Sequence, residues 1–320
     1  MTPSSAIFDR PLTYTPDSVK YLIPLTTFWR QGVNECSLPP ITTQETQEYT
    51  ELPENFQFAL TTQKPSQTLL AKVTVPAGET KTQIIDLQSK ELEGDGTCKT
   101  DLHFVAQDAS TLNLYLVQHF TETVDHRSEL LIELADDAKA NVVIVDFGAK
   151  THALNVKAKL ANRAKLDLGA VYFATGEQKY DYNYHIIQAG EASEANIDLH
   201  GALQDKAQKI MRYTLDFLKG SHGAVGDESE VVTLLSDGVK NASVPYLLSG
   251  EDDVEGSHAA SIGQLDLDSL FYLMTRGLSL EDAKQIMIRA QFSAILDRLP
   301  QGDLYDLLMQ ELESKMDEVL

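Results

Sequence analysis

Cysteine, tryptophan and basic residues are scarce in this chain of 320 residues, which holds 2 cysteines and 1 tryptophan. Two cysteines exclude a disulfide-built scaffold and any metal cage of four thiolates from one chain, and they fit a reducing compartment. Lys and Arg number 26 against 48 Asp and Glu, which gives a formal net charge of −22. Nucleic acid and anionic membrane surfaces are therefore not expected partners.

Long apolar runs and targeting signals are also missing. No apolar stretch reaches the roughly 18 residues of a membrane span. The opening MTPSSAIFDRPLTY has neither the basic start nor the apolar core of a signal peptide. Apolar residues make up 42% of the chain, which is ordinary for a globular protein and too many for a disordered acidic one. We therefore expect a folded, soluble, cytoplasmic protein.

The first part of the chain is predicted to be an N-terminal region, residues 1–67, irregular as far as about residue 60. Seven prolines interrupt residues 1–60, where Thr and Gln are also frequent. Within it, YLIPLTTFW (21–29) is apolar enough to pack on another surface and contains Trp29. We expect an arm that covers an edge of the main domain. A ligand-stacking role for Trp29 is the alternative.

Alternating apolar and polar residues dominate the middle of the chain, the period of two that is typical of strands. Short turns rich in Asp, Gly, Asn and Ala separate the segments, and no pattern of helical period interrupts them. We place the core domain at residues 68–262. The predicted strands are 68–75, 82–87, 102–107, 112–120, 129–134, 141–147, 152–160, 166–173, 184–189, 196–203, 209–218 and 230–235.

A weak internal repeat runs through this block. A polar pair, an alanine and a new strand recur at Ala109, Ala138, Ala164 and Ala192, with separations of 29, 26 and 28 residues. Two short strands per repeat predict a parallel, right-handed β-helix or β-solenoid, with small residues where the coils stack closely. A sandwich or barrel of hairpins would also show regularly spaced turns, so it remains the alternative.

The last part of the chain changes to a helical pattern, and we expect a small C-terminal α-helical region at 263–320. Two helices are predicted within 265–296, joined at Arg276-Gly277, with Gly277 ending the first and Ser279 capping the second. The apolar stripe of the second helix is predicted to hold Ala283, Ile286, Met287, Ala290 and Ile295. A third helix over 303–320 carries Leu304, Leu307, Leu308, Leu312 and Met316 on one stripe.

Familiar catalytic motifs are absent from the sequence. It contains no GxGxxG, Walker A loop, HExxH or CxxC. The glycine-rich run GSHGAVGDESE (220–230) lacks the following Lys-Ser/Thr pair, and its acids would repel a phosphate. We interpret it as a turn between coils.

The histidines are scattered over many predicted strands, at His103, His119, His126, His152, His185, His200, His222 and His258. Histidines on separate strands can converge on a metal in a barrel, as in cupins. The cupin arrangement needs two His separated by one residue, however, and no HxH occurs here. We expect most of these histidines to be structural or surface residues.

The densest polar stretch is SGEDDVEGSHAASIG (249–263). Its carboxylates and its imidazole are competent ligands for iron or zinc. His258 is the main candidate ligand and Glu255 the weaker one. The alternative is a solvated acidic turn with an incidental histidine.

The same stretch opens a segment, 244–292, that resembles the C-terminal signature of the SufB/SufD family. The pattern joins an acidic step, a His-Ala-Ala-Ser element, a Gly-x-Leu-Asp step and two helix motifs. The matching residues are Asp252-Asp253-Val254, His258-Ala259-Ala260-Ser261, Gly263-x-Leu265-Asp266, Leu270-Phe271-Tyr272 and Arg276-Gly277. Upstream, HGALQDKAQKI (200–210) and NASVPYLL (241–248) are also similar to the family core.

The resemblance implies a non-catalytic scaffold of the SUF machinery for iron–sulfur cluster assembly. It implies a parallel β-helix with flanking N-terminal and helical regions, paired through its end with a SufB-type paralogue or with itself. It also implies that the helices dock SufC, an ABC-type ATPase. The residues assigned to that docking surface are Leu270, Phe271, Tyr272, Met274, Arg276, Gly277, Ile286 and Met287.

The chain departs from the SufB pattern in its thiols. Gly256 stands where a cysteine often precedes the signature histidine, and Cys36 and Cys98 lie outside or at the fringe of the matched part. Because thiolates usually hold iron–sulfur clusters, we expect a SufD-like subunit. Such a subunit holds no cluster alone and shares a transient one with its partner, with His258 at the interface. A cupin-like or β-helix metal-dependent enzyme is the alternative function.

Overall fold

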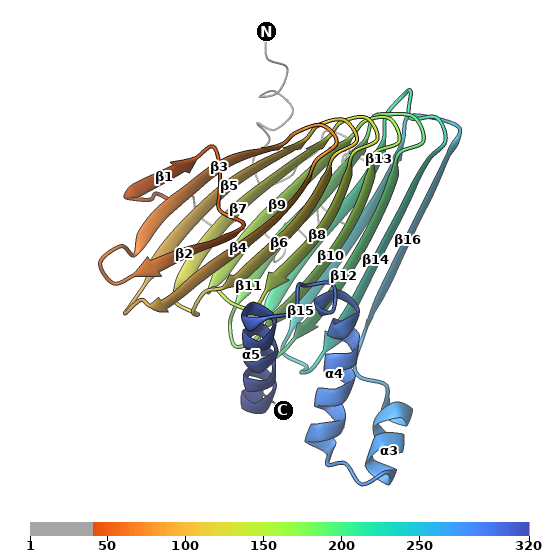
Figure 1. Ribbon diagram of the computed structural model, residues 1–320. Coiled ribbons are helices and arrows are strands. Elements are labelled where there is room, and N and C mark those ends of the chain that lie inside the picture. The colour runs from red at the N-terminus through yellow and green to blue at the C-terminus, as the bar shows by residue number, and fades with distance from the viewer. Residues whose placement is uncertain (1–40, 320) are drawn as a thin grey trace.

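The computed structural model describes residues 41–319. The predicted N-terminal arm, Trp29 and Cys36 fall outside the described residues. The described chain forms two parallel sheets wound as one solenoid, followed by three helices at the C-terminal end (Figure 1).

Successive strands alternate between the two sheets. The odd-numbered sheet holds β1 (Glu45–Tyr49), β3 (Ser66–Val75), β5 (Gly96–Ala106), β7 (Val124–Leu134), β9 (Thr151–Leu160), β11 (Lys179–Gln188), β13 (Gln208–Phe217) and β15 (Lys240–Ser249), in that order. The even-numbered sheet holds β2 (Asn55–Thr61), β4 (Thr80–Glu91), β6 (Thr111–His119), β8 (Lys139–Asp146), β10 (Lys165–Ala174), β12 (Glu194–Leu203), β14 (Ala224–Leu234) and β16 (Val254–Gly263).

Strand pairing confirms the β-solenoid and rules out the sandwich of hairpins. Every pairing between the named strands of the described chain is parallel, and each strand pairs with the strand two positions on in the sequence. A hairpin would pair consecutive strands antiparallel. One coil therefore contributes one strand to each sheet.

The interior of the solenoid is filled by every second side chain of each strand, as the period of two predicts. In β5, for example, Cys98, Thr100, Leu102, Phe104 and Ala106 are buried and point inward, whereas the residues that alternate with them are half-buried. Each fully buried Leu or Phe contributes about 1.5–3 kcal/mol relative to an exposed one. The core therefore extends through all coils.

A column of left-handed residues shapes one row of turns. Gly78, Ala109, Asp137, Arg163, Ala192 and Gly223 all have a positive φ, and each donates its backbone N–H to a carbonyl in the turn of the next coil. The bond from Ala109 to Asp136 is 2.9 Å long, as is the bond from Asp137 to Asn162. The left-handed conformation disfavours large β-branched residues and is easiest for Gly, Asn or Asp.

This column corrects the predicted role of the turn alanines. Ala138 and Ala164 are fully buried between coils, as expected from close stacking. Ala109 and Ala192 are exposed and occupy the left-handed position instead, one residue earlier in the turn. The four alanines are therefore two kinds of turn residue.

The solenoid begins earlier than the sequence predicted. β1 and β2 lie within the stretch expected to be irregular, and β2 buries Phe56, Phe58 and Leu60. These strands are short and adjoin Pro53 and a region rich in Thr and Gln, so their alternation was hard to detect. At the other end, the last strand finishes at Gly263.

The helices agree with the predicted boundaries. α3 spans Leu267–Thr275, α4 spans Leu280–Leu296 and α5 spans Asp303–Val319. Gly277, with a φ of 99°, follows the C-cap of α3, and the Ser279 side chain accepts a hydrogen bond from the Asp282 N–H at the start of α4.

Helices α4 and α5 cover the outer face of the even-numbered sheet. Phe292 and Ile295 of α4, together with Leu308 and Leu312 of α5, pack against valines and Phe173 of that face. The buried stripe of α4 is Ala283, Ile288, Phe292, Ile295 and Leu296, so the predicted placement of Ile286 and Ala290 on it is wrong. The difference arises because α3 and the first half of α4 project beyond the sheet (Figure 1). Among the described residues, no helix has the length and apolarity needed to span a bilayer.

Candidate functional site

The two last strands, β15 and β16, form an open end of the solenoid (Figure 1). Each is the outermost strand of its sheet, so one backbone edge of each pairs with no other described strand. Every residue of β16 after Val254 is exposed. Natural proteins usually protect such an edge, because it can pair with a strand of another chain.

His258 lies on β16 and points toward the interior side of this open end. It is in register with Glu228 of β14, whose side chain is buried inside the solenoid. Gly256, two residues earlier, faces the same way, because a Cβ there would lie 2.5 Å from the side chain of Leu247 and 3.0 Å from that of Phe217. Since residues two apart share a face of a strand, His258 stands at the mouth of the interior.

Glu228 is the carboxylate nearest to His258 in the strand register, and it is unusual. The residue is 2% exposed, and neither carboxylate oxygen has a hydrogen-bond partner among the described residues. Burial raises the pKa of Glu228 to about 9. It is therefore a neutral acid at pH 7 unless a cation joins it.

Glu230, two residues along the same face, has a different environment. The Tyr172 hydroxyl donates a hydrogen bond of 3.0 Å to it, and the Lys209 ammonium pairs with it in full burial. Lys209 also donates to Ser243 on β15 at 3.1 Å. Among the described residues, the buried ammonium of Lys209 thus forms its ion pair with Glu230, and no cation pairs with Glu228.

Glu255 does not join His258. Odd-numbered and even-numbered residues of β16 point to opposite faces of the strand, so Glu255 points away from the face of His258. Ser257 shares the face of Glu255, and its hydroxyl donates a hydrogen bond to the exposed Asp227 on the outer face. The two predicted metal-ligand candidates therefore point to opposite sides of β16. Sequence reasoning missed Glu228 because it lies one coil upstream, although the coil-length repeat was the signal that could have found it.

The acidic step before β16 is a turn. Glu251 accepts hydrogen bonds from the backbone N–H groups of Gly220 and Asp252, which lower its pKa. Asp253 pairs with the exposed His222 at 2.9 Å. Among the described residues, no group of three or more His, Cys, Asp or Glu is placed to hold a metal ion. Any metal at the open end therefore needs ligands from elsewhere as well.

The projecting helices carry the other predicted site. Phe271 is 69% exposed and Tyr272 56%, and Leu267, Met274 and Ile286 are exposed beside them. The Arg276 guanidinium lies 5.1 Å from the Tyr272 ring centroid. Leu270, by contrast, is only 6% exposed and packs α3 in place, so its side chain is not available to a partner. We call the exposed set Leu267, Phe271, Tyr272, Met274 and Ile286 the helical patch.

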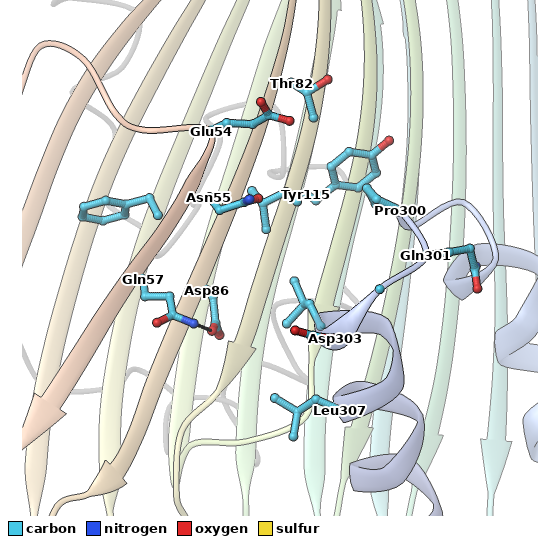
Figure 2. Close-up of a pocket in the computed structure, with 14 residues that line it drawn as sticks. Glu54, Asn55, Gln57, Thr82, Asp86, Tyr115, Pro300, Gln301, Asp303 and Leu307 are labelled. Atoms are coloured by element: carbon cyan, nitrogen blue, oxygen red, sulfur yellow. Dashed lines mark hydrogen bonds between the residues drawn. The ribbon is translucent and has the colours of Figure 1, made fainter.

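A cavity of about 650 Å³ opens between α5 and the strands β2, β4 and β6 (Figure 2). Gln57 donates a hydrogen bond of 3.2 Å to Asp86 on its floor, with Asp303 and Leu307 of α5 on the helix side. The fourteen lining residues include no Cys, Ser, His, Lys or Arg. Its ionisable lining residues are instead the carboxylates Glu54, Asp86 and Asp303 and the phenol of Tyr115.

Two further histidines, His126 and His152, and Cys98 lie buried inside the solenoid. His126 and His152 stack inside the solenoid with ring centroids 4.3 Å apart, and burial lowers the pKa of His126 well below its usual value. The Cys98 thiol is fully buried in the interior, which raises its pKa. In the part of the chain that the structure describes, the strand histidines do not converge as a cupin site requires.

Comparison with known proteins agrees with this arrangement. Residues 58–291 match the family described as SUF system FeS cluster assembly, SufBD core domain. The chain is 33% identical over 150 residues to the iron–sulfur cluster assembly protein SufD of Bacillus subtilis, an overlap of 47% of this chain and 34% of that protein. It is 24% identical over 232 residues to an iron–sulfur cluster assembly SufBD family protein of Mycobacterium leprae, covering 70% and 59%.

A SufBD family protein of Pyrococcus horikoshii is 26% identical over 190 residues, which is 59% of this chain and 42% of that protein. The chain thus spans less than two thirds of the length of these relatives. The family match covers most of the solenoid together with α3 and most of α4. The chain belongs to the SufBD family of iron–sulfur cluster assembly proteins.

Proposed function

We propose that this protein is a non-catalytic scaffold subunit of the SUF machinery, working in the cytoplasm. The observation that carries the proposal is the open end, where an unprotected edge strand presents His258 toward the interior. Strand addition from another chain would satisfy the free backbone groups of β15 and β16. The pairing subunit is a SufB-type paralogue or a second copy of this chain.

An iron–sulfur cluster at this end would be cargo shared between the paired subunits. Thiolates are the usual cluster ligands, and Cys98, the cysteine among the described residues, is fully buried. The described part of the chain therefore offers the imidazole of His258 but no accessible thiol, and we expect the partner to supply the thiols. Replacing His258 by Ala should lower the cluster yield of the reconstituted complex, and an unchanged yield would show that His258 is not a ligand.

The helical patch is the proposed docking surface for SufC, the ABC-type ATPase of the machinery. Its apolar side chains project beyond the sheet and are exposed. Burial of this surface by a partner would favour binding by about 25 cal/mol per Å² of apolar area. Arg276 and Gly277 shape the end of α3 beside this surface.

Co-purification from the native host tests both contacts in one experiment. A tagged chain should recover the ATPase and a cysteine-bearing paralogue. Phe271→Asp should lose the ATPase and keep the paralogue, whereas Leu218→Asp, an exposed apolar residue on a turn of the solenoid, should keep both.

Substitution of the edge strand separates the pairing contact. Ile262→Lys on β16 should lose the paralogue, because a lysine on the edge opposes strand addition. Thr46→Lys on β1, at the opposite end of the solenoid, is the matched control. Recovery of neither protein by the unmodified chain would contradict the scaffold assignment.

A further inference from the structure

We propose that Glu228 and His258 together form one half of an iron(II) site at the open end of the solenoid. The inference rests on the proposed function, because it takes iron as the cargo of this end. What it adds is the second ligand, a carboxylate one coil upstream of the histidine.

Register places the two side chains together. Glu228 of β14 is the partner of His258 of β16 in a parallel pair that runs in register from Ala224 to Thr233. Neighbouring strands lie about 4.8 Å apart, and in-register residues of parallel strands project from the same face. Metal–oxygen and metal–nitrogen bonds of about 2.0–2.2 Å would then let one ion bridge a carboxylate and an imidazole.

The lack of hydrogen-bond partners for the Glu228 carboxylate is a second, independent observation that points to a bound cation. Both of its oxygens are buried and have no partner among the described residues. Leaving a buried polar group unsatisfied costs about 1–3 kcal/mol, so native structures rarely retain one without a role. Glu230 shows that the solenoid interior can provide partners for a buried carboxylate, because it accepts a hydrogen bond from Tyr172 and forms an ion pair with Lys209.

The donor set favours iron(II) over a cluster. A carboxylate and an imidazole are the ligands of non-haem iron(II), whereas clusters need thiolates. Gly256, on the same face as His258, supplies no thiol, and the side chains of Leu247 and Phe217 fill the place where its Cβ would stand. Two ligands do not complete a coordination sphere, so water or the pairing subunit supplies the rest.

Titration of the full chain with cobalt(II) under anaerobic conditions tests the site directly, since cobalt absorbs visible light when it is ligated. The unmodified chain should bind one ion, and Glu228→Gln and His258→Ala should each weaken binding at least about tenfold. Because the two residues hold one ion, the double variant should bind little worse than either single one. Glu255→Gln, on the opposite face of β16, should bind like the unmodified chain. Competition by iron(II) should remove the cobalt absorption.

Glutamine has the shape of the neutral glutamic acid, so Glu228→Gln should fold, and the circular dichroism spectrum checks it. If it does not fold, Glu228→Asp keeps the carboxylate but withdraws it by one methylene, and the same tenfold loss is expected.

Failure of the Glu228 site and failure of the scaffold function would give different experimental results. Equal cobalt binding by Glu228→Gln and the unmodified chain overturns the role of Glu228, even if His258→Ala loses the ion. Cobalt binding that depends on both residues, in a chain that recovers neither ATPase nor paralogue, keeps the iron site and removes the scaffold function.

Discussion

The Nδ1 atom of His119 lies 2.8 Å from a carboxylate oxygen of Glu311, so an imidazole of β6 ties α5 to the solenoid. The other ring nitrogen lies 2.6 Å from Asp86 of β4. Burial by itself would lower the pKa of His119, but the hydrogen bonds to Asp86 and Glu311 outweigh it and raise the pKa to about 9. The imidazolium is thus held between two carboxylates at neutral pH.

This ion pair should make the attachment of α5 depend on pH. A raised pKa stabilises the folded protein fully below the unfolded value of about 6.5, and the benefit disappears as the pH rises through about 9. Glu311→Gln should therefore cost about 1–2 kcal/mol of unfolding free energy at pH 6.5 and almost nothing at pH 10. Urea unfolding followed by circular dichroism at both pH values measures the difference. The control is Glu313→Gln, which breaks only the exposed pair with Arg289. Equal losses at the two pH values would contradict the prediction.

Gly201 should be intolerant of a side chain. A Cβ there would lie 2.0 Å from the ring of Tyr172, which crosses over it to reach Glu230. Gly201→Ala should cost about 1–3 kcal/mol, because the buried ring cannot move without losing its hydrogen bond. Gly263→Ala, where nothing lies within 4 Å, should change stability little. Thermal unfolding of both variants provides the measurement, and similar midpoints would show that Tyr172 is free to shift.

Lys209→Met should be among the most damaging single substitutions. It leaves the Glu230 carboxylate buried without its cation, which typically costs about 3–5 kcal/mol. Lys165→Met, which breaks the exposed pair with Glu194, should cost under about 1 kcal/mol. Adding Glu230→Gln to Lys209→Met should restore part of the loss, because the orphaned charge is removed. A double variant less stable than Lys209→Met would refute this account.

Cys98 should be unreactive while the protein is folded. Its thiol is fully buried, and burial raises its pKa, so almost no thiolate forms. In a Cys36→Ser variant, a maleimide reagent at pH 8 should label the chain only after urea is added. Mass spectrometry gives the stoichiometry. Complete labelling of the folded protein would mean that the interior around β5 opens readily.

The alternation of apolar residues predicted most strands, and the change of period predicted the helices after Gly263, because both features are local. The parallel solenoid was predicted from the repeat and from the family resemblance, and strand pairing was needed to rule out the sandwich of hairpins. Gly277 and Ser279 were predictable for the same reason, since a cap needs only its own turn. β1, β2 and β16 were not among the predicted strands, and β16 was taken for part of a polar stretch because it has few apolar residues.

The pairing of His258 with a carboxylate could be identified only from the tertiary structure. The sequence placed His258 in a motif and paired it with Glu255, its neighbour along the chain. Strand parity sends those two side chains to opposite faces, and the winding of one coil brings Glu228 beside His258 instead. The sequence could determine that the chain is too poor in thiols to hold a cluster by itself. Which carboxylate faces the histidine is decided by register, a relation between residues one coil apart that no local pattern contains.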